Sequence, residues 1–153
     1  MMKRRFGWCA RQVNGVARFL SAGVVAVAVL AGCASTGGGL GKDTPPEVLA
    51  AKVQERALAR WQAVIDGELE RAYNDYMSAA SKEVATFEAF KQRTRGAGVV
   101  YRSVEADSVK CTGESCTVSL FVWFDHRMIK GSRTPMEEVW IVDKGQAWYV
   151  WRQ

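Results

Sequence analysis

Proton transfer is the chemistry that the side chains of this sequence come nearest to supporting. Such a site needs a base inside an apolar cavity and a hydroxyl or acid that stabilises the developing oxyanion. The candidate bases are Asp125 and His126, and the candidate hydroxyl donors are Tyr73 and Tyr76. Because neighbouring residues of a strand point to opposite faces, Asp125 and His126 cannot both face one pocket. A strand-end histidine bonded to its neighbours and tyrosines packed in the core are commoner roles, so we expect no catalytic residue.

Other reactive motifs are missing from the sequence. It contains no nucleophile triad, no P-loop and no cluster of metal ligands, so we expect neither a metal nor a cofactor. Residues 130–135 (KGSRTP) are predicted to form a polar loop. A phosphate-binding loop would need a helix N-terminus after it, and strand-like residues follow instead.

The first 32 residues have the organisation of a signal peptide. Five basic residues and no acidic ones occur here, and residues 19–30 (FLSAGVVAVAVL) are apolar except for Ser21. This apolar run is too short for the roughly 30 Å hydrocarbon core, which needs about 20 residues. Small residues follow it, as at a signal-peptidase site. We therefore expect a targeting segment that is removed.

The end of this segment, Leu30-Ala31-Gly32-Cys33, resembles the lipobox of bacterial lipoproteins. In that family the cysteine sulfur receives a diacylglycerol, and the chain is then cleaved ahead of it. The resemblance implies that Cys33 becomes the lipidated first residue of the mature protein. Ala34, where inner-membrane lipoproteins tend to have Asp, favours the periplasmic side of the outer membrane. Two or three acyl chains such as palmitate, at roughly 0.8 kcal/mol per buried methylene, anchor a protein almost permanently.

Cys111 and Cys116 are the cysteines that remain once Cys9 leaves with the signal peptide and Cys33 takes lipid. They flank a turn in VKCTGESCTV, and both flanks have strand-like residues. Facing residues at a non-hydrogen-bonded hairpin position have Cα atoms about 4.5 Å apart, which is within the disulfide range. We predict a cross-hairpin disulfide, because the periplasm is oxidising.

Removal of residues 1–32 also changes the charge balance. The chain has 21 basic and 16 acidic residues, and five of the basic ones belong to the predicted signal, so the mature protein has 16 of each. Phosphate neutralisation dominates the affinity of nucleic-acid-binding proteins. A mature net charge of zero without a basic stripe argues against a nucleic-acid partner.

Helical periodicity occupies the first half of the mature chain. A helix is predicted to start at Asp43-Thr44-Pro45-Pro46, with a capping side chain before the prolines, and to end at Asp66-Gly67. Its apolar positions run from Leu49 to Ile65, with charged residues, including Arg60, among the intervening positions. A second helix capped by Asp66 follows over 69–77, then a small-residue break over 78–81, then a short helix capped by Thr86.

The periodicity changes from 3.6 to 2 after Gly98. Strands are predicted over 99–110, 117–128, 138–142 and 147–151, the last two joined by a turn at 143–146. Helices followed by antiparallel strands predict an α+β domain whose N-terminal helices pack on a curved antiparallel sheet. We assign this domain to residues 43–153, which have the size of a single domain. Residues 33–42 (CASTGGGLGK) are predicted to be a flexible tether.

Four features occur over about residues 47–153: the Asp66-Gly67 break, the Ala72-Tyr73 pair, the short helix from Phe87 and a final strand with tryptophans. With these features the folded part resembles the nuclear transport factor 2-like superfamily, especially its small bacterial lipoprotein members. The resemblance implies a cone, with a bent sheet wrapped around the first helix and a pocket at one end. The predicted pocket residues are Trp61, Tyr73, Tyr76, Phe124 and His126.

Both faces of the strand over 117–128 are apolar. One helical layer covers a single face, so Phe121 and Trp123 are predicted to form an interaction surface for a second copy of the chain or another envelope protein. The predicted function is a lipid-anchored, non-catalytic envelope lipoprotein that binds a protein partner or a small apolar ligand. The alternative is a small pocket enzyme of the ketosteroid isomerase or dehydratase kind.

Overall fold

The computed structural model describes residues 39–152. The predicted signal peptide, the lipidation of Cys33 and most of the predicted tether lie outside this range. Within it, no helix is both long enough and apolar enough to cross a membrane.

The long first helix, α1 (Pro46–Asp66), supplies one side of the core. Its buried residues recur at helical spacing, from Leu49 through Val53 and Ala57 to Val64. The helix ends as predicted at Gly67, whose φ of 87° is the left-handed conformation that glycine adopts without steric cost. Its start differs from the prediction, because no side chain caps it and the Thr44 hydroxyl accepts a hydrogen bond from the Gly41 amide instead.

Three short helices follow: α2 (Leu69–Asn74), α3 (Ala79–Val84) and α4 (Phe87–Arg95). The predicted break at 78–81 is in fact the start of α3, because the Ser78 hydroxyl accepts a hydrogen bond from the Ser81 amide and caps it. Asp66 does not cap α2 but accepts a hydrogen bond from Gln62. Thr86 caps α4 as predicted, since its hydroxyl accepts from the Ala89 amide. A 3₁₀ turn, η1 (Gly96–Gly98), leads into the sheet.

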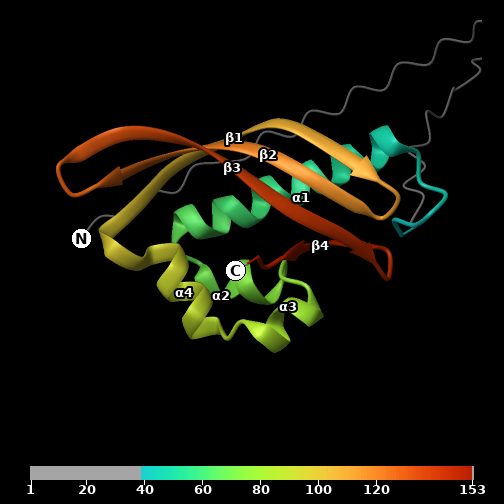
Figure 1. Cartoon of the computed structure of the whole chain (residues 1–153), viewed down its shortest axis with the longest axis horizontal. Coiled ribbons are helices and arrows are strands. Elements are labelled where there is room, and N and C mark those ends of the chain that lie inside the picture. The colour runs from blue at the N-terminus through green and yellow to red at the C-terminus, as the bar shows by residue number, and fades with distance from the viewer. Residues whose placement is uncertain (1–38, 153) are drawn as a thin grey trace, which may run out of the picture. The chain divides into compact units, whose positions relative to one another are not determined.

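The sheet is an antiparallel meander in the order β1-β2-β3-β4. Its strands are β1 (Val99–Thr112), β2 (Ser115–His126), β3 (Ile129–Asp143) and β4 (Gln146–Val150). The helices lie on one face of the curved sheet, with α1 along it (Figure 1). This is the predicted α+β class, in which N-terminal helices pack on a curved antiparallel sheet.

The predicted polar loop at 130–135 belongs to β3. Arg133 pairs with Trp123 and Pro135 pairs with Phe121, so the β2–β3 hairpin extends to a tight turn at Arg127 and Met128. β4 pairs only with residues 139–143, which leaves this half of β3 as an edge strand. Edge positions tolerate a proline and solvated polar side chains, which is why the segment looks like a loop in the sequence.

The ordered domain begins before residue 43. The Leu40 amide donates a 2.9 Å hydrogen bond to the Gly145 carbonyl, and Leu40 packs against the core. A Cβ at Gly39 would lie 2.8 Å from the Gly145 Cα, so this close approach requires glycine. Residues 39–42, which were predicted to belong to the tether, are therefore part of the fold.

Candidate functional site

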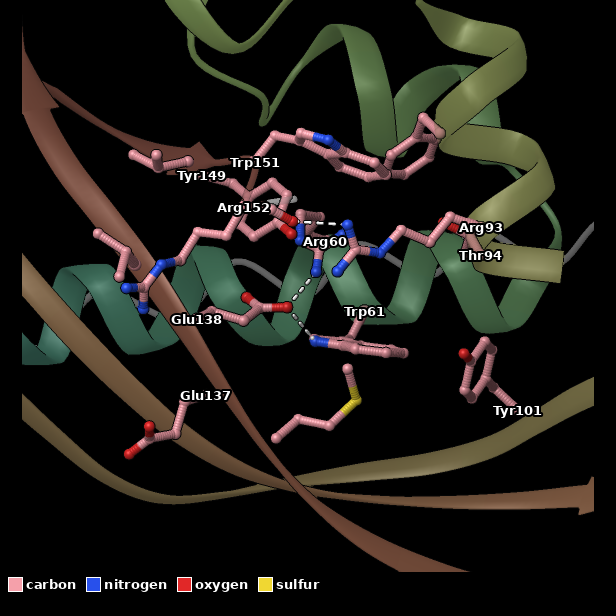
Figure 2. A pocket seen from close by; sticks show the side chains of 14 residues that line it. Arg60, Trp61, Arg93, Thr94, Tyr101, Glu137, Glu138, Tyr149, Trp151 and Arg152 are labelled. Atoms are coloured by element: carbon pink, nitrogen blue, oxygen red, sulfur yellow. Dashed lines mark hydrogen bonds and ion pairs between the residues drawn. The ribbon is translucent and has the colours of Figure 1, made fainter. Parts of the chain in front are cut away.

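A cavity of about 170 Å³ lies between α1, α4 and the strands β1, β3 and β4. Figure 2 shows its lining, which comes from these elements and from the residues after β4. We call it the Arg60–Glu138 cavity. Its lining residues are Arg60, Trp61, Phe90, Arg93, Thr94, Tyr101, Met136, Glu137, Glu138, Val139, Tyr149, Val150, Trp151 and Arg152.

A buried ion pair joins Arg60 of α1 to Glu138 of β3 at this cavity. The same Glu138 oxygen accepts a 2.7 Å hydrogen bond from the Trp61 indole, and the other oxygen accepts a 3.0 Å bond from the Trp140 indole. Figure 2 shows the first two donors converging on the carboxylate. Three donors on one carboxylate compensate the cost of burying its charge.

The sequence places these partners through simple periodicities. Arg60 and Trp61 are consecutive on α1, and both face the sheet. Glu138 and Trp140 are two apart on β3, so they share one face of the strand. Arg60 also lies over the Tyr149 ring, 4.1 Å from its centroid, so β4 covers the pair from the other side.

Aromatic rings form much of the cavity wall. Burial raises the pKa of the Tyr101 phenol, and the positive charge of Arg60 opposes that shift in part. Burial also raises the pKa of Tyr149; the Glu138 charge adds to the increase, while Arg60 opposes it. Both phenols therefore stay protonated at neutral pH and can donate a hydrogen bond.

A second arginine, Arg93 of α4, lies at the edge of the cavity. Its guanidinium donates a 2.6 Å hydrogen bond to the Arg152 carbonyl and lies 4.7 Å from the centroid of the Trp151 ring. Within residues 39–152 no carboxylate forms an ion pair with Arg93. The lining therefore combines a compensated buried pair with two arginines, Arg93 and Arg152, that form no ion pair within the described residues.

Hydrogen bonds from buried donors occupy the carboxylate of Glu138. A general base needs a free lone pair within reach of the proton that it removes. The Glu138 carboxylate instead accepts from Arg60, Trp61 and Trp140 at once. In the described part of the chain no three His, Cys, Asp or Glu side chains gather as a metal site would require.

Only one of the five residues predicted to line a pocket lies in the lining of this cavity. Trp61 lines the Arg60–Glu138 cavity, whereas the other four do not. The Tyr73 hydroxyl donates to the Ala85 carbonyl at 2.9 Å. Tyr76 is buried beneath the Arg56 guanidinium, 4.9 Å from its ring centroid. Both tyrosines thus have packing roles.

Phe124 and His126 lie near the end of β2 and do not belong to the cavity lining, although Phe124 pairs with the lining residue Tyr101. The pairing register shifts between them, so the strict alternation assumed for this strand is interrupted at Asp125. His126 Nε2 is buried and has no hydrogen-bond partner among the described residues, unlike the bonded strand-end histidine that was expected. Asp125 accepts hydrogen bonds from Arg102 of β1 and from the Gly131 amide of β3, so its carboxylate joins β2 to both neighbouring strands.

The predicted interaction residues, Phe121 and Trp123, lie on the sheet face opposite the buried side chains of β2 and are half-buried. The Arg133 guanidinium covers them in part, 3.5 Å from the Phe121 ring centroid and 5.3 Å from that of Trp123. The described helices lie on the other side of the sheet (Figure 1). Phe121 and Trp123 therefore remain at the surface, with one arginine over them.

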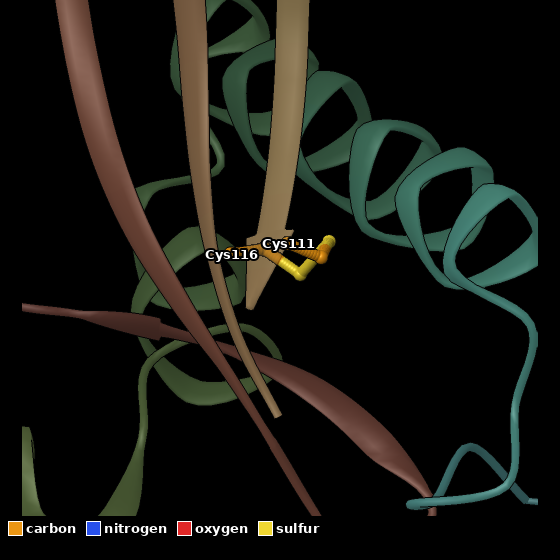
Figure 3. The surroundings of a disulfide bond; sticks show 2 residues. All are labelled: Cys111 and Cys116. Atoms are coloured by element: carbon orange, nitrogen blue, oxygen red, sulfur yellow. A yellow bond between two sulfur atoms is a disulfide. The ribbon is translucent and has the colours of Figure 1, made fainter. Parts of the chain in front are cut away.

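Cys111 and Cys116 face each other across the β1–β2 hairpin (Figure 3). Their sulfur atoms are 2.08 Å apart, which is a bonded distance, and their Cα atoms are 4.0 Å apart. Cys116 is buried and Cys111 packs against the same core. The bond closes the hairpin beside the two-residue turn at Gly113 and Glu114.

Arg60 and Glu138 were missed as site residues. The prediction that Arg60 lies among the polar positions of the first helix is wrong, because the residue is only 4% exposed. The signal was present: Arg60 follows Val53 by seven residues and Ala57 by three, which places it in the buried stripe. Glu138 likewise alternates with Trp140 on the strand.

Comparison with known proteins adds a structural likeness. No family model matches the chain, and no curated protein does. Among solved structures, a provisionally assigned nuclear transport factor 2-like transpeptidase from Campylobacter jejuni aligns with a TM-score of 0.47. The alignment covers 64% of this chain and 96% of that one, at 7% identity. At this identity the roles of that protein's residues do not transfer to this chain.

Proposed function

We propose that this chain is a lipid-anchored envelope lipoprotein whose domain binds a small ligand in the Arg60–Glu138 cavity without reacting with it. The observation that best supports the binding role is the hydrogen bonding of the Glu138 carboxylate. Its carboxylate accepts from three buried donors, so the most obvious base of the cavity is already committed to holding the site together. The surrounding aromatic rings supply a surface on which an apolar group can pack.

The same features argue against the pocket enzyme. An isomerase or dehydratase of that kind needs a carboxylate or imidazole with a free lone pair facing the substrate. Asp125 is bonded to Arg102 and Gly131, and His126 does not line the cavity. The site therefore favours a ligand that binds and leaves unchanged.

The anchoring part of the proposal is supported by the sequence around Cys33 and by the disulfide. A lipobox-like tetrapeptide follows the apolar run, and Ala34 favours the outer membrane. A bonded pair at Cys111 and Cys116 suits the oxidising periplasm. Together they support a mature protein attached to the membrane by lipid on the periplasmic side.

Metabolic labelling with a palmitate analogue tests the anchor. The full chain should incorporate the label, and Cys33→Ser should lose it. Cys9→Ser is the matched control, because Cys9 lies inside the removed segment and its replacement should leave labelling intact. Equal labelling of the Cys33→Ser protein would contradict the anchor.

Native mass spectrometry of the protein purified from the envelope tests the binding role. We expect a co-purifying small molecule that is lost from Thr94→Phe, because Thr94 lines the cavity and a phenyl ring there would fill it. Thr112→Phe is the control, since Thr112 is exposed at the far end of β1. Absence of any bound molecule in the unmodified protein, or equal retention in both variants, would contradict the binding role.

A further inference from the structure

The Arg60–Glu138 cavity carries more positive charge than its ion pair compensates. Arg60 has a side chain only 5% exposed, and its Nε is buried without a hydrogen-bond partner among the described residues. Arg93 is exposed, and among the described residues its one side-chain hydrogen bond goes to a backbone carbonyl. Glu137, the second acidic residue of the lining, is directed away from the Arg60–Glu138 pair (Figure 2). An anionic group in the cavity would therefore approach two guanidinium groups.

The volume and the walls limit the rest of the ligand. A cavity of about 150 Å³ holds one benzene molecule, and this one has about 170 Å³. A single ring with one small substituent is thus near the upper size. The walls are suited to a planar apolar body, because five aromatic side chains line the cavity: Trp61, Phe90, Tyr101, Tyr149 and Trp151.

We propose that the ligand is a single-ring aromatic carboxylate of the benzoate class, with its carboxylate at Arg93 and its ring among the aromatic walls. This inference rests on the proposed binding function and specifies its ligand. A guanidinium fork matches a carboxylate in two parallel hydrogen bonds. Tyr101 and Tyr149 make no side-chain hydrogen bond within the described residues, so their phenol groups are available as additional donors. Burial of the apolar ring adds binding free energy that a small anion without a ring would lack.

The test is isothermal titration calorimetry on the full chain reconstituted in lipid nanodiscs, with empty nanodiscs as the blank. Benzoate is compared with benzamide, which has the same shape without the charge, and with acetate, which has the charge without the ring. We expect benzoate to bind at least about tenfold more tightly than either, since hydrogen bonds to charged groups reach that magnitude.

Arg93→Gln should weaken benzoate binding about tenfold and leave benzamide binding unchanged, because only the charged partner is lost. Arg133→Gln is the matched control: Arg133 is an exposed arginine over Phe121 and outside the cavity, so both affinities should stay as they are. Circular dichroism of each variant verifies that it is folded.

Two results would overturn the inference. If benzamide binds as tightly as benzoate, or if Arg93→Gln binds benzoate normally, the ligand is not recognised as an anion, while the binding function stands. If none of the three probes binds but a molecule of another class co-purifies, the benzoate class is wrong and the cavity still binds. The separate mass-spectrometric test decides on the binding function itself: that function fails if no small molecule co-purifies with the unmodified protein.

Discussion

Arg60 of α1 and Glu138 of β3 form an ion pair whose side chains are only 5% and 3% exposed. The pair joins the first helix to the sheet across the core, with two tryptophan indoles completing the carboxylate's hydrogen bonds. A buried pair of this kind contributes little relative to apolar packing, yet removal of one partner leaves an uncompensated charge inside the protein. The pair therefore affects the free energy of unfolding mainly when one of its two residues is replaced.

Glu138→Gln is expected to lower the free energy of unfolding by about 3 kcal/mol, because it leaves Arg60 as a buried unpaired cation. The amide oxygen still accepts a hydrogen bond, but the amide NH2 faces a donor where the second carboxylate oxygen accepted, so the loss combines the unpaired charge with a broken hydrogen bond. Urea unfolding followed by tryptophan fluorescence measures it. Lys52→Ala is the control: the Lys52–Glu55 pair is exposed, and its loss should cost less than about 0.5 kcal/mol.

The double variant Arg60→Met/Glu138→Gln should be more stable than Glu138→Gln alone. Methionine fills the space of the arginine stem without a charge, so the uncompensated cation is removed. A double variant no more stable than the single one would contradict the view that the buried charge causes the loss.

The disulfide between Cys111 and Cys116 is expected to contribute roughly 2 kcal/mol, which is the chain-entropy value for a loop this short. Urea unfolding of the protein with and without a reductant measures the difference. Thiol titration of the unreduced, unfolded protein gives the control: Cys111 and Cys116 should not react until reductant is added. Two reactive thiols before reduction would show that the bond does not form.

The first helix and the sheet class could be predicted from the sequence, because their periodicities extend over many residues. The turn at 143–146 was also predictable: its strand ends lie at Asp143 and Gln146, and glycine at position 145 takes a φ of 81°. The length of β3 could not be predicted, because its first half is an edge strand, where polar residues and Pro135 are tolerated. The sequence of this half therefore lacks the alternation of apolar and polar residues that indicates a strand.

The cavity was harder to predict, because it is assembled from residues far apart in the chain. Arg60 and Glu138 are 78 residues apart, and neither shows from its own surroundings that it has a buried partner. Charged residues are almost never fully buried unless paired, so a single sequence favours a solvated position for each. Only the buried stripe of α1 indicated the position of Arg60.

The sheet face that bears Phe121 and Trp123 is where we expect a second copy of the chain or another envelope protein to bind. Trp123→Ala should shift the protein toward the monomer in size-exclusion chromatography with light scattering, since aromatic side chains dominate such interfaces. Val84→Ala is the control, because Val84 is 66% exposed on α3, away from that face. An unchanged molar mass and unchanged crosslinking of Trp123→Ala would argue against the interface.

Asp125 should make the stability of the domain depend on pH in the acid range. The Gly131 amide and then the Arg102 guanidinium lower the pKa of this carboxyl in the folded state. The unfolded chain therefore takes up the proton first, so the stabilisation is present above about pH 4 and is lost as the pH falls through the folded pKa. Urea midpoints between pH 6 and pH 2.5, values chosen to bracket about pH 4, should fall less steeply for Asp125→Asn. Arg102→Gln removes one donor and keeps Gly131, so an intermediate slope is expected; a slope equal to that of Asp125→Asn would mean that the arginine alone sets the pKa.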